Sequence, residues 1–168
     1  VFATGTPVSN TIAEAWNIYP SLGGVYNQSS RRWTFPVGAV IEFGHLEHEH
    51  SVHAYQSAEY AFLGFDELTE FLESQYAYMR SRLRTTATLE DGSTVPCVIR
   101  SATNPGGIGH AWVRARWRSW LGDQPERAKS GEVRWYDAEG REVKLGTAGA
   151  LSRQFIGAKL TDNPALMD

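Results

Sequence analysis

The sequence is poor in cysteine, in long apolar runs and in excess charge, and each shortage narrows the range of functions. Cys97 is the only cysteine, so no internal disulfide can form, which fits a reducing compartment. No apolar run approaches the roughly 18 residues that a membrane-spanning helix needs, and no signal-peptide pattern opens the chain. The net charge of −3 neither favours nor excludes nucleic acid. We therefore expect no disulfide scaffold and no membrane.

The length of 168 residues favours one domain or a piece of a larger one. Hydrophobic residues make up 42% of the chain and aromatic residues 12%, which is enough for a core and argues against global disorder. The chain begins at Val1 without an initiator methionine, and residues 163–168 contain no structural stop. We expect the sequence to be a fragment.

Hydrophobic periodicity predicts strands and helices in alternation. Helical spacing occurs at 12–19, 70–83 and 110–121, and apolar runs predict strands at 60–65, 97–102 and 151–158, with the tail of another at 1–4. Turn signals predict two hairpins, 32–36 with 39–43 and 133–136 with 142–145. Apolar strands separated by crossover helices indicate an α/β sandwich with a largely parallel sheet, to which the two hairpins are added.

Two carboxylates, Asp66 and Glu67, directly follow the apolar strand at 60–65. The carboxyl ends of parallel strands are where α/β folds bind ligands. In P-loop ATPases the Asp of such a pair positions Mg²⁺, and the next Glu orients and deprotonates the attacking water. The same residues would also suit a helix start, with Asp66 as the cap and Glu67 and Glu70 in the first turn. Alone, this string leaves both interpretations open.

A second polar motif follows the strand at 97–102, and reads Ser-Ala-Thr-Asn-Pro-Gly-Gly over residues 101–107. A small polar residue at a strand end beside the acidic strand can contact a γ-phosphate or its water. The two glycines let the backbone approach a ligand closely. An ordinary Asn-Pro-Gly turn is the simpler alternative. The two motifs in this order favour a shared site over two unrelated turns.

Five blocks of sequence follow one another in a recognisable order. The central one is YQSAEYAFLGFDELTEF (55–71), and the others are IYPSLGGVYNQSSRRWTFPVGAVIEFGHLE (18–47), QYAYMRSRLR (75–84), SATNPGGIGHAWVRARW (101–117) and RQFIGAKLTDNPALM (153–167). Together they resemble the ATPase domain of bacteriophage terminase large subunits, and the central block looks like that family's second nucleotide-binding motif. The resemblance covers residues 14–168.

The resemblance implies a P-loop NTPase-type three-layer sandwich with a mostly parallel sheet, N-terminally incomplete. Residues 1–168 would be a partial ATPase domain of the terminase large subunit. The family hydrolyses ATP with Mg²⁺ to move double-stranded viral DNA into a procapsid. The implied partners are the DNA, a small terminase subunit, the portal protein and further copies of the chain in a homo-oligomeric ring. The implied location is the host cytoplasm and not the mature virion.

Carried over residue by residue, the resemblance makes Asp66 the Mg²⁺-associated acid and Glu67 the catalytic base. Thr103 and Asn104 would belong to the motif that couples hydrolysis to DNA movement, with Thr103 near the nucleotide and Asn104 reporting the γ-phosphate. Arg82 and Arg84 are candidate phosphate-facing arginines, able to reach a neighbouring subunit's ATP. A solvated or ion-paired helix face is the alternative for both arginines.

The chain departs from the family pattern in three respects. Ser57 stands where the family typically has glycine. No Gly-x-x-x-x-Gly-Lys-Ser/Thr occurs, and the family's nuclease domain is also absent. Without the phosphate-binding loop, this fragment alone is expected to bind ATP poorly and to be inactive.

Two other interpretations stay open. Thr4-Gly5-Thr6-Pro7 resembles a motif of superfamily 2 helicases, which predicts a helicase-like fragment. The dense run of histidines and glutamates between His45 and His53 suggests a histidine-rich metal-binding module, because His48 and His50 on a strand would share one face and could bind Zn²⁺. A solvated polar loop is the alternative for that run.

Overall fold

The computed structural model describes residues 2–4 and 8–162. The chain divides into two compact units, Val1–His110 and Ala111–Asp168. Each unit has its own sheet. We describe the two separately, because the candidate site lies within the first.

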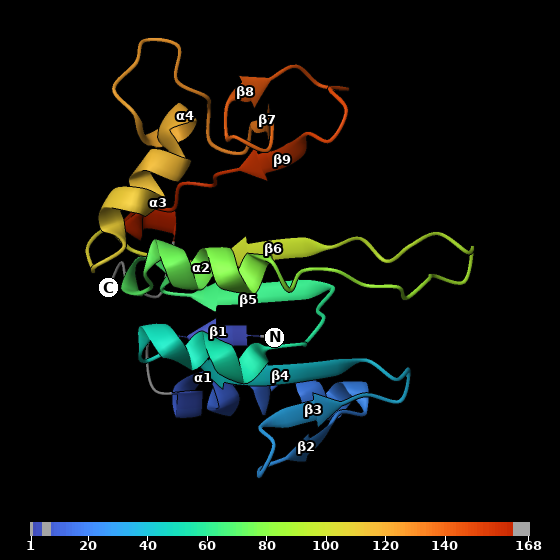
Figure 1. The fold of residues 1–168 in the computed structure, drawn as a ribbon. Helices are drawn as coiled ribbons and strands as arrows, with labels where there is room; N and C mark the ends of the chain where they lie inside the picture. Colours follow the sequence, from blue (N-terminus) through green and yellow to red (C-terminus); the bar gives the residue numbers. More distant parts are fainter. Residues whose placement is uncertain (1, 5–7, 163–168) are drawn as a thin grey trace. The chain divides into compact units, whose positions relative to one another are not determined.

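The first unit is built on a six-stranded mixed sheet in the order β2-β3-β4-β1-β5-β6 (Figure 1). Its strands are β1 (Phe2–Thr4), β2 (Val25–Asn27), β3 (Arg32–Thr34), β4 (Val40–His45), β5 (Phe62–Asp66) and β6 (Val98–Ser101). Strands β4, β1, β5 and β6 run parallel, whereas β2 and β3 extend the sheet antiparallel from β4. The predicted α/β class with parallel strands is therefore confirmed.

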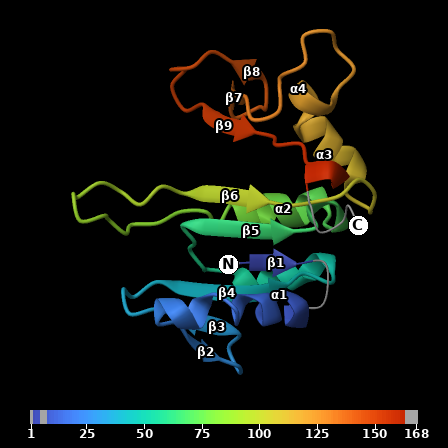
Figure 2. The same ribbon diagram turned by 180° about the vertical axis from the view of Figure 1, so that it is seen from behind.

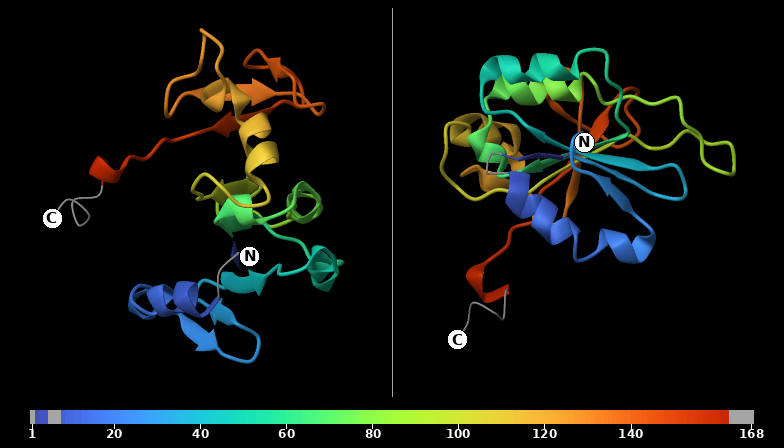
Figure 3. Two further views of the ribbon diagram at one scale, coloured as in Figure 1. Left: turned by 90° about the vertical axis from the view of Figure 1, so that its left-hand side faces the viewer. Right: turned by 90° about the horizontal axis from the view of Figure 1, so that it is seen from below.

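Helical segments cover both faces of this sheet (Figures 2 and 3). On one face lie α1 (Val8–Ala15) and the 3-10 helix η1 (Tyr19–Leu22), and on the other lie the 3-10 helix η2 (Glu49–Tyr55) and α2 (Glu73–Arg80). The side chain of Gln75 links α2 to the segment that follows β4. Its amide donates hydrogen bonds to the carbonyls of Leu46 at 3.0 Å and His48 at 3.1 Å. Gly44 of β4 leaves room for the Tyr55 hydroxyl, which a Cβ there would meet.

Two aromatic groups fill the space between the sheet and its helices. Trp33 of β3 is fully buried and packs with Ala15 and Phe43, while the rings of Trp16 and Tyr19 approach it edge-on. Phe65 of β5 lies against two rings of the following segment, Phe71 with a centroid distance of 5.6 Å and Tyr76 with 5.3 Å, and all three are buried. Burial of large rings is the main stabilising contribution in such a core.

The second unit contains a smaller antiparallel sheet in the order β8-β7-β9. Its elements are α3 (His110–Arg116, beginning at the last residue of the first unit), α4 (Arg118–Leu121), β7 (Val133–Tyr136), β8 (Glu142–Val143), β9 (Leu151–Gln154) and the 3-10 helix η4 (Leu160–Asp162). Trp120, Ala128 and Tyr136 form its buried core. The hairpin predicted at 133–145 is therefore part of a separate sheet.

Several predicted boundaries were wrong. The helix predicted at 12–19 spans Val8–Ala15, and a separate 3-10 helix that contains Pro20 begins at Tyr19. The helix predicted at 70–83 is shortened to Glu73–Arg80, because residues 68–70 form the 3-10 helix η3 (Leu68–Glu70) and the backbone of Arg82 and Arg84 pairs with Tyr60 instead. Side-chain periodicity could not reveal these backbone contacts.

Other differences concern extended segments and helix continuity. The helix predicted at 110–121 breaks at Trp117, whose φ of −106° and ψ of 27° are not helical. The strand predicted at 151–158 ends at Gln154. Strand β2 was not predicted, since Val25, Tyr26 and Asn27 make too short an apolar run to stand out. Among the helices of residues 2–4 and 8–162, none has the length and apolar character needed to cross a bilayer.

Candidate functional site

The two acidic residues lie at the carboxyl end of the parallel strands. Asp66 is the last residue of β5 and pairs in register with Thr4, the last residue of β1. Phe65 pairs with Ser101, the last residue of β6. The strands therefore end together, and the chain after β6 emerges beside Asp66 and Glu67. This is the edge at which α/β sheets bind ligands.

Glu67 has a left-handed backbone, with φ 54° and ψ 56°. This conformation costs an ordinary L-residue about 1–2 kcal/mol, and non-glycine residues hold it only where neighbours fix the chain. Two backbone hydrogen bonds hold this turn: Leu68 N–H donates to the Ala102 carbonyl at 3.0 Å, and Glu70 N–H donates to the Glu67 carbonyl at 2.8 Å. A helical segment does start here, but Glu67 rather than Asp66 is the residue before its first turn, and the Glu67 side chain makes no capping hydrogen bond.

A pair of threonines joins the turn after β5 to the loop after β6. The N–H of Thr69 donates to Thr103 Oγ1 at 3.0 Å, and the two hydroxyl oxygens lie 2.8 Å apart. The Thr69 hydroxyl also lies 3.0 Å from the Asn104 carbonyl oxygen. Thr69 is only 5% exposed. Sequence reasoning missed it, although it stands three residues beyond Asp66.

The glycines of the second motif allow the loop to lie close to this turn. Gly107 has φ +70, and a Cβ there would overlap the carbonyl oxygen of Thr69. The N–H of Gly109 donates to that same carbonyl at 2.7 Å. Of the two glycines, only Gly107 lies this close to the neighbouring turn, because a Cβ on Gly106 would meet no atom of the described residues within 4 Å. A close approach of this backbone to a ligand stays a prediction.

The electrostatics of this edge suit a cation held jointly with a ligand. In the described part of the chain, neither Asp66 nor Glu67 takes part in an ion pair, and both are half-buried. No group of three His, Cys, Asp or Glu side chains in that part could hold a metal by itself. Mg²⁺ commonly binds one or two carboxylates and takes its remaining ligands from phosphates and water. The residues present therefore fit a Mg²⁺–phosphate complex better than a protein-only metal site.

The two candidate arginines lie away from this edge. Arg82 accepts, through its carbonyl, the N–H of Tyr60 at 3.0 Å, and the Arg84 N–H donates to the Tyr60 carbonyl at 2.9 Å. Tyr60 precedes β5, whereas Asp66 ends it, so the arginines flank the opposite end of the strand. The Arg84 guanidinium pairs with Glu59 at 2.9 Å, and that of Arg82 lies 4.9 Å from the centroid of the Tyr78 ring. The structure does not bring them together with Asp66 within one chain.

The histidine-rich segment does not form the strand on which His48 and His50 would share a face. Residues Glu49–Tyr55 form the 3-10 helix η2, and the rings of His48 and His50 stack with centroids 5.4 Å apart. Within the described residues no three metal-ligating groups converge there. The helicase-like motif was read from Thr4 to Pro7, and residues 5–7 of it lie outside the described residues.

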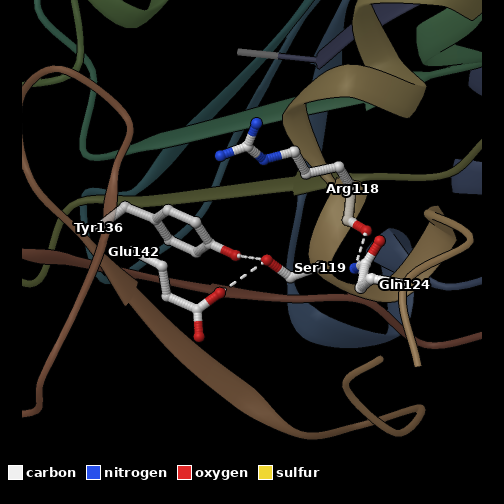
Figure 4. Close-up of a pocket in the computed structure, with 5 residues that line it drawn as sticks. All are labelled: Arg118, Ser119, Gln124, Tyr136 and Glu142. Atoms are coloured by element: carbon white, nitrogen blue, oxygen red, sulfur yellow. Dashed lines mark hydrogen bonds between the residues drawn. The ribbon is translucent and has the colours of Figure 1, made fainter. Parts of the chain in front are cut away.

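The second unit has a polar pocket of about 350 Å³, lined by Arg118, Ser119, Gln124, Tyr136 and Glu142 (Figure 4). The Tyr136 hydroxyl donates to Ser119 Oγ and that hydroxyl to the Glu142 carboxylate, both at 2.7 Å. Arg134 donates to the other oxygen of the same carboxylate at 2.8 Å. Burial raises the pKa of Tyr136. These hydrogen bonds join α4, β7 and β8, so the network stabilises the second unit.

Comparison with known families gave a match to a family model. The model described as terminase large subunit, T4likevirus-type, N-terminal, matches residues 22–140. The matched segment contains both strand-end motifs, with Asp66, Glu67, Thr103 and Asn104. A search of the curated proteins gave no match, and neither did a search of the solved structures.

Proposed function

The chain belongs to the family of T4-type terminase large subunits, in their N-terminal part, and from this premise we propose that, together with a phosphate-binding loop, it forms an ATPase that drives double-stranded DNA into a viral procapsid. The observation that supports this proposal is the edge where β5 and β6 end side by side, with Asp66 and Glu67 at the end of β5 and Thr103 and Asn104 beyond β6. Such an edge is the usual place of nucleotide chemistry in α/β folds.

In the proposed reaction, Glu67 orients a water molecule and takes its proton as the water attacks the γ-phosphorus of ATP. The bond from that phosphorus to the β,γ-bridging oxygen breaks, giving ADP and inorganic phosphate. Asp66 would hold Mg²⁺, which neutralises charge on the phosphates when bound. Asn104 would lie near the γ-phosphate and Thr103 beside it. The half-buried carboxylates without ion pairs support these roles.

The proposed reaction needs a phosphate-binding loop, and none occurs in these 168 residues. Strand β6 has no neighbour on its outer side among the described strands. A further parallel strand there would end beside Ser101, and a phosphate-binding loop at its carboxyl end would face Asp66. That addition would complete a P-loop NTPase-type three-layer sandwich.

The proposed partners follow from the family. They are double-stranded DNA, a small terminase subunit and the portal protein, in the host cytoplasm. Several copies of the chain would form a ring. In such a ring Arg82 and Arg84 could serve the ATP of a neighbouring copy, because they lie at the opposite end of β5 from Asp66.

The test is Mg²⁺-dependent ATP hydrolysis by the protein with its phosphate-binding loop present. Glu67→Gln keeps the size of the side chain and removes the base, so kcat is expected to fall by about 10²–10⁴-fold. Glu70→Gln is the matched control: Glu70 is exposed on the same turn, and kcat should stay within about twofold. Hydrolysis that survives Glu67→Gln at near the original rate would refute the proposed mechanism.

A further inference from the structure

We propose that Thr69 is a positioning residue. Through its hydroxyl contact with Thr103 it holds the turn after β5 against the loop at 101–109, and this contact fixes the orientation of the Glu67 carboxylate. This inference rests on the proposed function, because it concerns the base of that reaction. It adds a residue to which neither the sequence motifs nor the family match gave a role.

All the polar groups of Thr69 engage that one loop. Its N–H and its hydroxyl meet Thr103 Oγ1 at 3.0 and 2.8 Å, its hydroxyl meets the Asn104 carbonyl at 3.0 Å, and its carbonyl accepts the Gly109 N–H at 2.7 Å. The side chain is 95% buried, so water cannot easily replace these partners. A displacement of the loop must therefore displace Thr69.

The hydrogen atoms can be assigned consistently. The Thr69 hydroxyl donates to the Asn104 carbonyl, and the Thr103 hydroxyl donates to Thr69 Oγ1 while accepting the Thr69 N–H. Each hydroxyl then donates once and accepts at least once. Serine at position 69 could form the same set, whereas valine, of nearly the same shape, could form none of the hydroxyl bonds.

Thr69 can influence the conformation of Glu67 because the backbone between them is short. Only Leu68 separates the two residues, and Leu68 is itself buried and bonded through its N–H to Ala102. Glu67 holds φ 54°, a conformation that is stable only while its neighbours fix it. Loss of the Thr69–Thr103 contact is therefore expected to let Glu67 relax toward an ordinary conformation and to turn its carboxylate away from the attacking water.

The experiment compares Thr69→Val and Thr69→Ser by steady-state ATP hydrolysis, with the melting temperature of each variant measured alongside. Thr69→Val is expected to lower kcat by about tenfold to a hundredfold, the effect of a small misplacement of a catalytic group, with KM for ATP changed less than threefold. Thr69→Ser should retain kcat within about threefold. The exposed Thr86→Val serves as a control for the substitution itself.

The outcomes separate this inference from the proposed function. If Glu67→Gln abolishes hydrolysis while Thr69→Val keeps kcat within threefold, the positioning role is wrong and the proposed function stands. If Thr69→Ser loses as much activity as Thr69→Val, the hydroxyl is not the responsible group, and the inference fails. If Thr69→Val does not fold, Thr69→Ala also removes the hydroxyl, and the same limits on kcat decide.

Discussion

The substitution Gly107→Ala measures how closely the loop at 101–109 is seated on the turn after β5. Gly107 has φ +70, and an added Cβ would overlap the Thr69 carbonyl oxygen and approach Glu70 Oε1. Gly92 has a similar φ of +81, but a Cβ there meets no atom within 4 Å. The two substitutions share the cost of a left-handed alanine, and only Gly107→Ala adds a clash.

The difference between these variants can be worked out from the structure. A left-handed conformation costs an L-residue about 1–2 kcal/mol. Replacing glycine returns about 0.4–1 kcal/mol by restricting the unfolded chain. Gly92→Ala should therefore lower the free energy of unfolding by about 1 kcal/mol. Overlap with backbone atoms, which cannot rotate away, adds about 1–3 kcal/mol, so Gly107→Ala should lower it by about 2–4 kcal/mol.

Denaturant unfolding of both variants gives this comparison, and amide hydrogen exchange locates the effect. The Gly109 N–H, which donates to the Thr69 carbonyl at 2.7 Å, should exchange faster in Gly107→Ala and unchanged in Gly92→Ala. Equal losses of stability in the two variants, with unchanged exchange at Gly109, would show that the loop does not contact the turn as described. The positioning role of Thr69 would then lose its structural basis.

Two further predictions concern the segment before β5. Ser57 has φ +69, so Ser57→Gly should raise the free energy of unfolding by up to about 1 kcal/mol. The β-branched Ser57→Val should lower the free energy of unfolding. A higher melting temperature for the valine variant than for the glycine variant would contradict this. Burial, with the nearby Glu42 carboxylate, raises the pKa of Tyr60 from its usual value of 10 to about 12. The stability linked to Tyr60 is therefore fully present below pH 10 and is lost as the pH rises toward 12. Spectrophotometric titration against Tyr60→Phe checks the shift, and a phenol that ionises near pH 10 would refute it.

The sequence predicted strands β5 and β6 best, because short apolar runs mark them. Strand β5 buries Leu63, Gly64 and Phe65 in succession, so it forms a continuous apolar run that ends at Asp66. Strand β6 begins with the half-buried pair Val98 and Ile99 and ends at polar residues. We expected the polar motifs after these two strands to lie beside each other, and the parallel pairing of β5 with β6 brings the two strand ends together. The roles of these residues in catalysis remain predictions.

What the sequence could not predict depends on backbone conformation and on contacts between distant residues. Nothing in the letters Asp-Glu-Leu-Thr shows that Glu67 is left-handed or that Thr69 meets a hydroxyl 34 residues away. The positions of Arg82 and Arg84 were hidden for a similar reason, since their backbone leaves the helix to pair with Tyr60. The backbone conformation at Ser57 was hidden as well: its φ of 69° favours glycine, the residue that the resemblance leads us to expect there.

Glu67 and Ser57 are both left-handed, but only one of them could be replaced by glycine without consequence for the proposed reaction. At Ser57, glycine would simply remove the conformational cost. At Glu67, glycine would remove the cost together with the base, so the cost of about 1–2 kcal/mol must be offset by neighbouring contacts. Those contacts come from Leu68 and Thr69, and their partners belong to the loop at 101–109. A movement that loosens the loop would therefore release Glu67 into an ordinary conformation, so that in the proposed ATPase the position of the loop and the orientation of the base vary together.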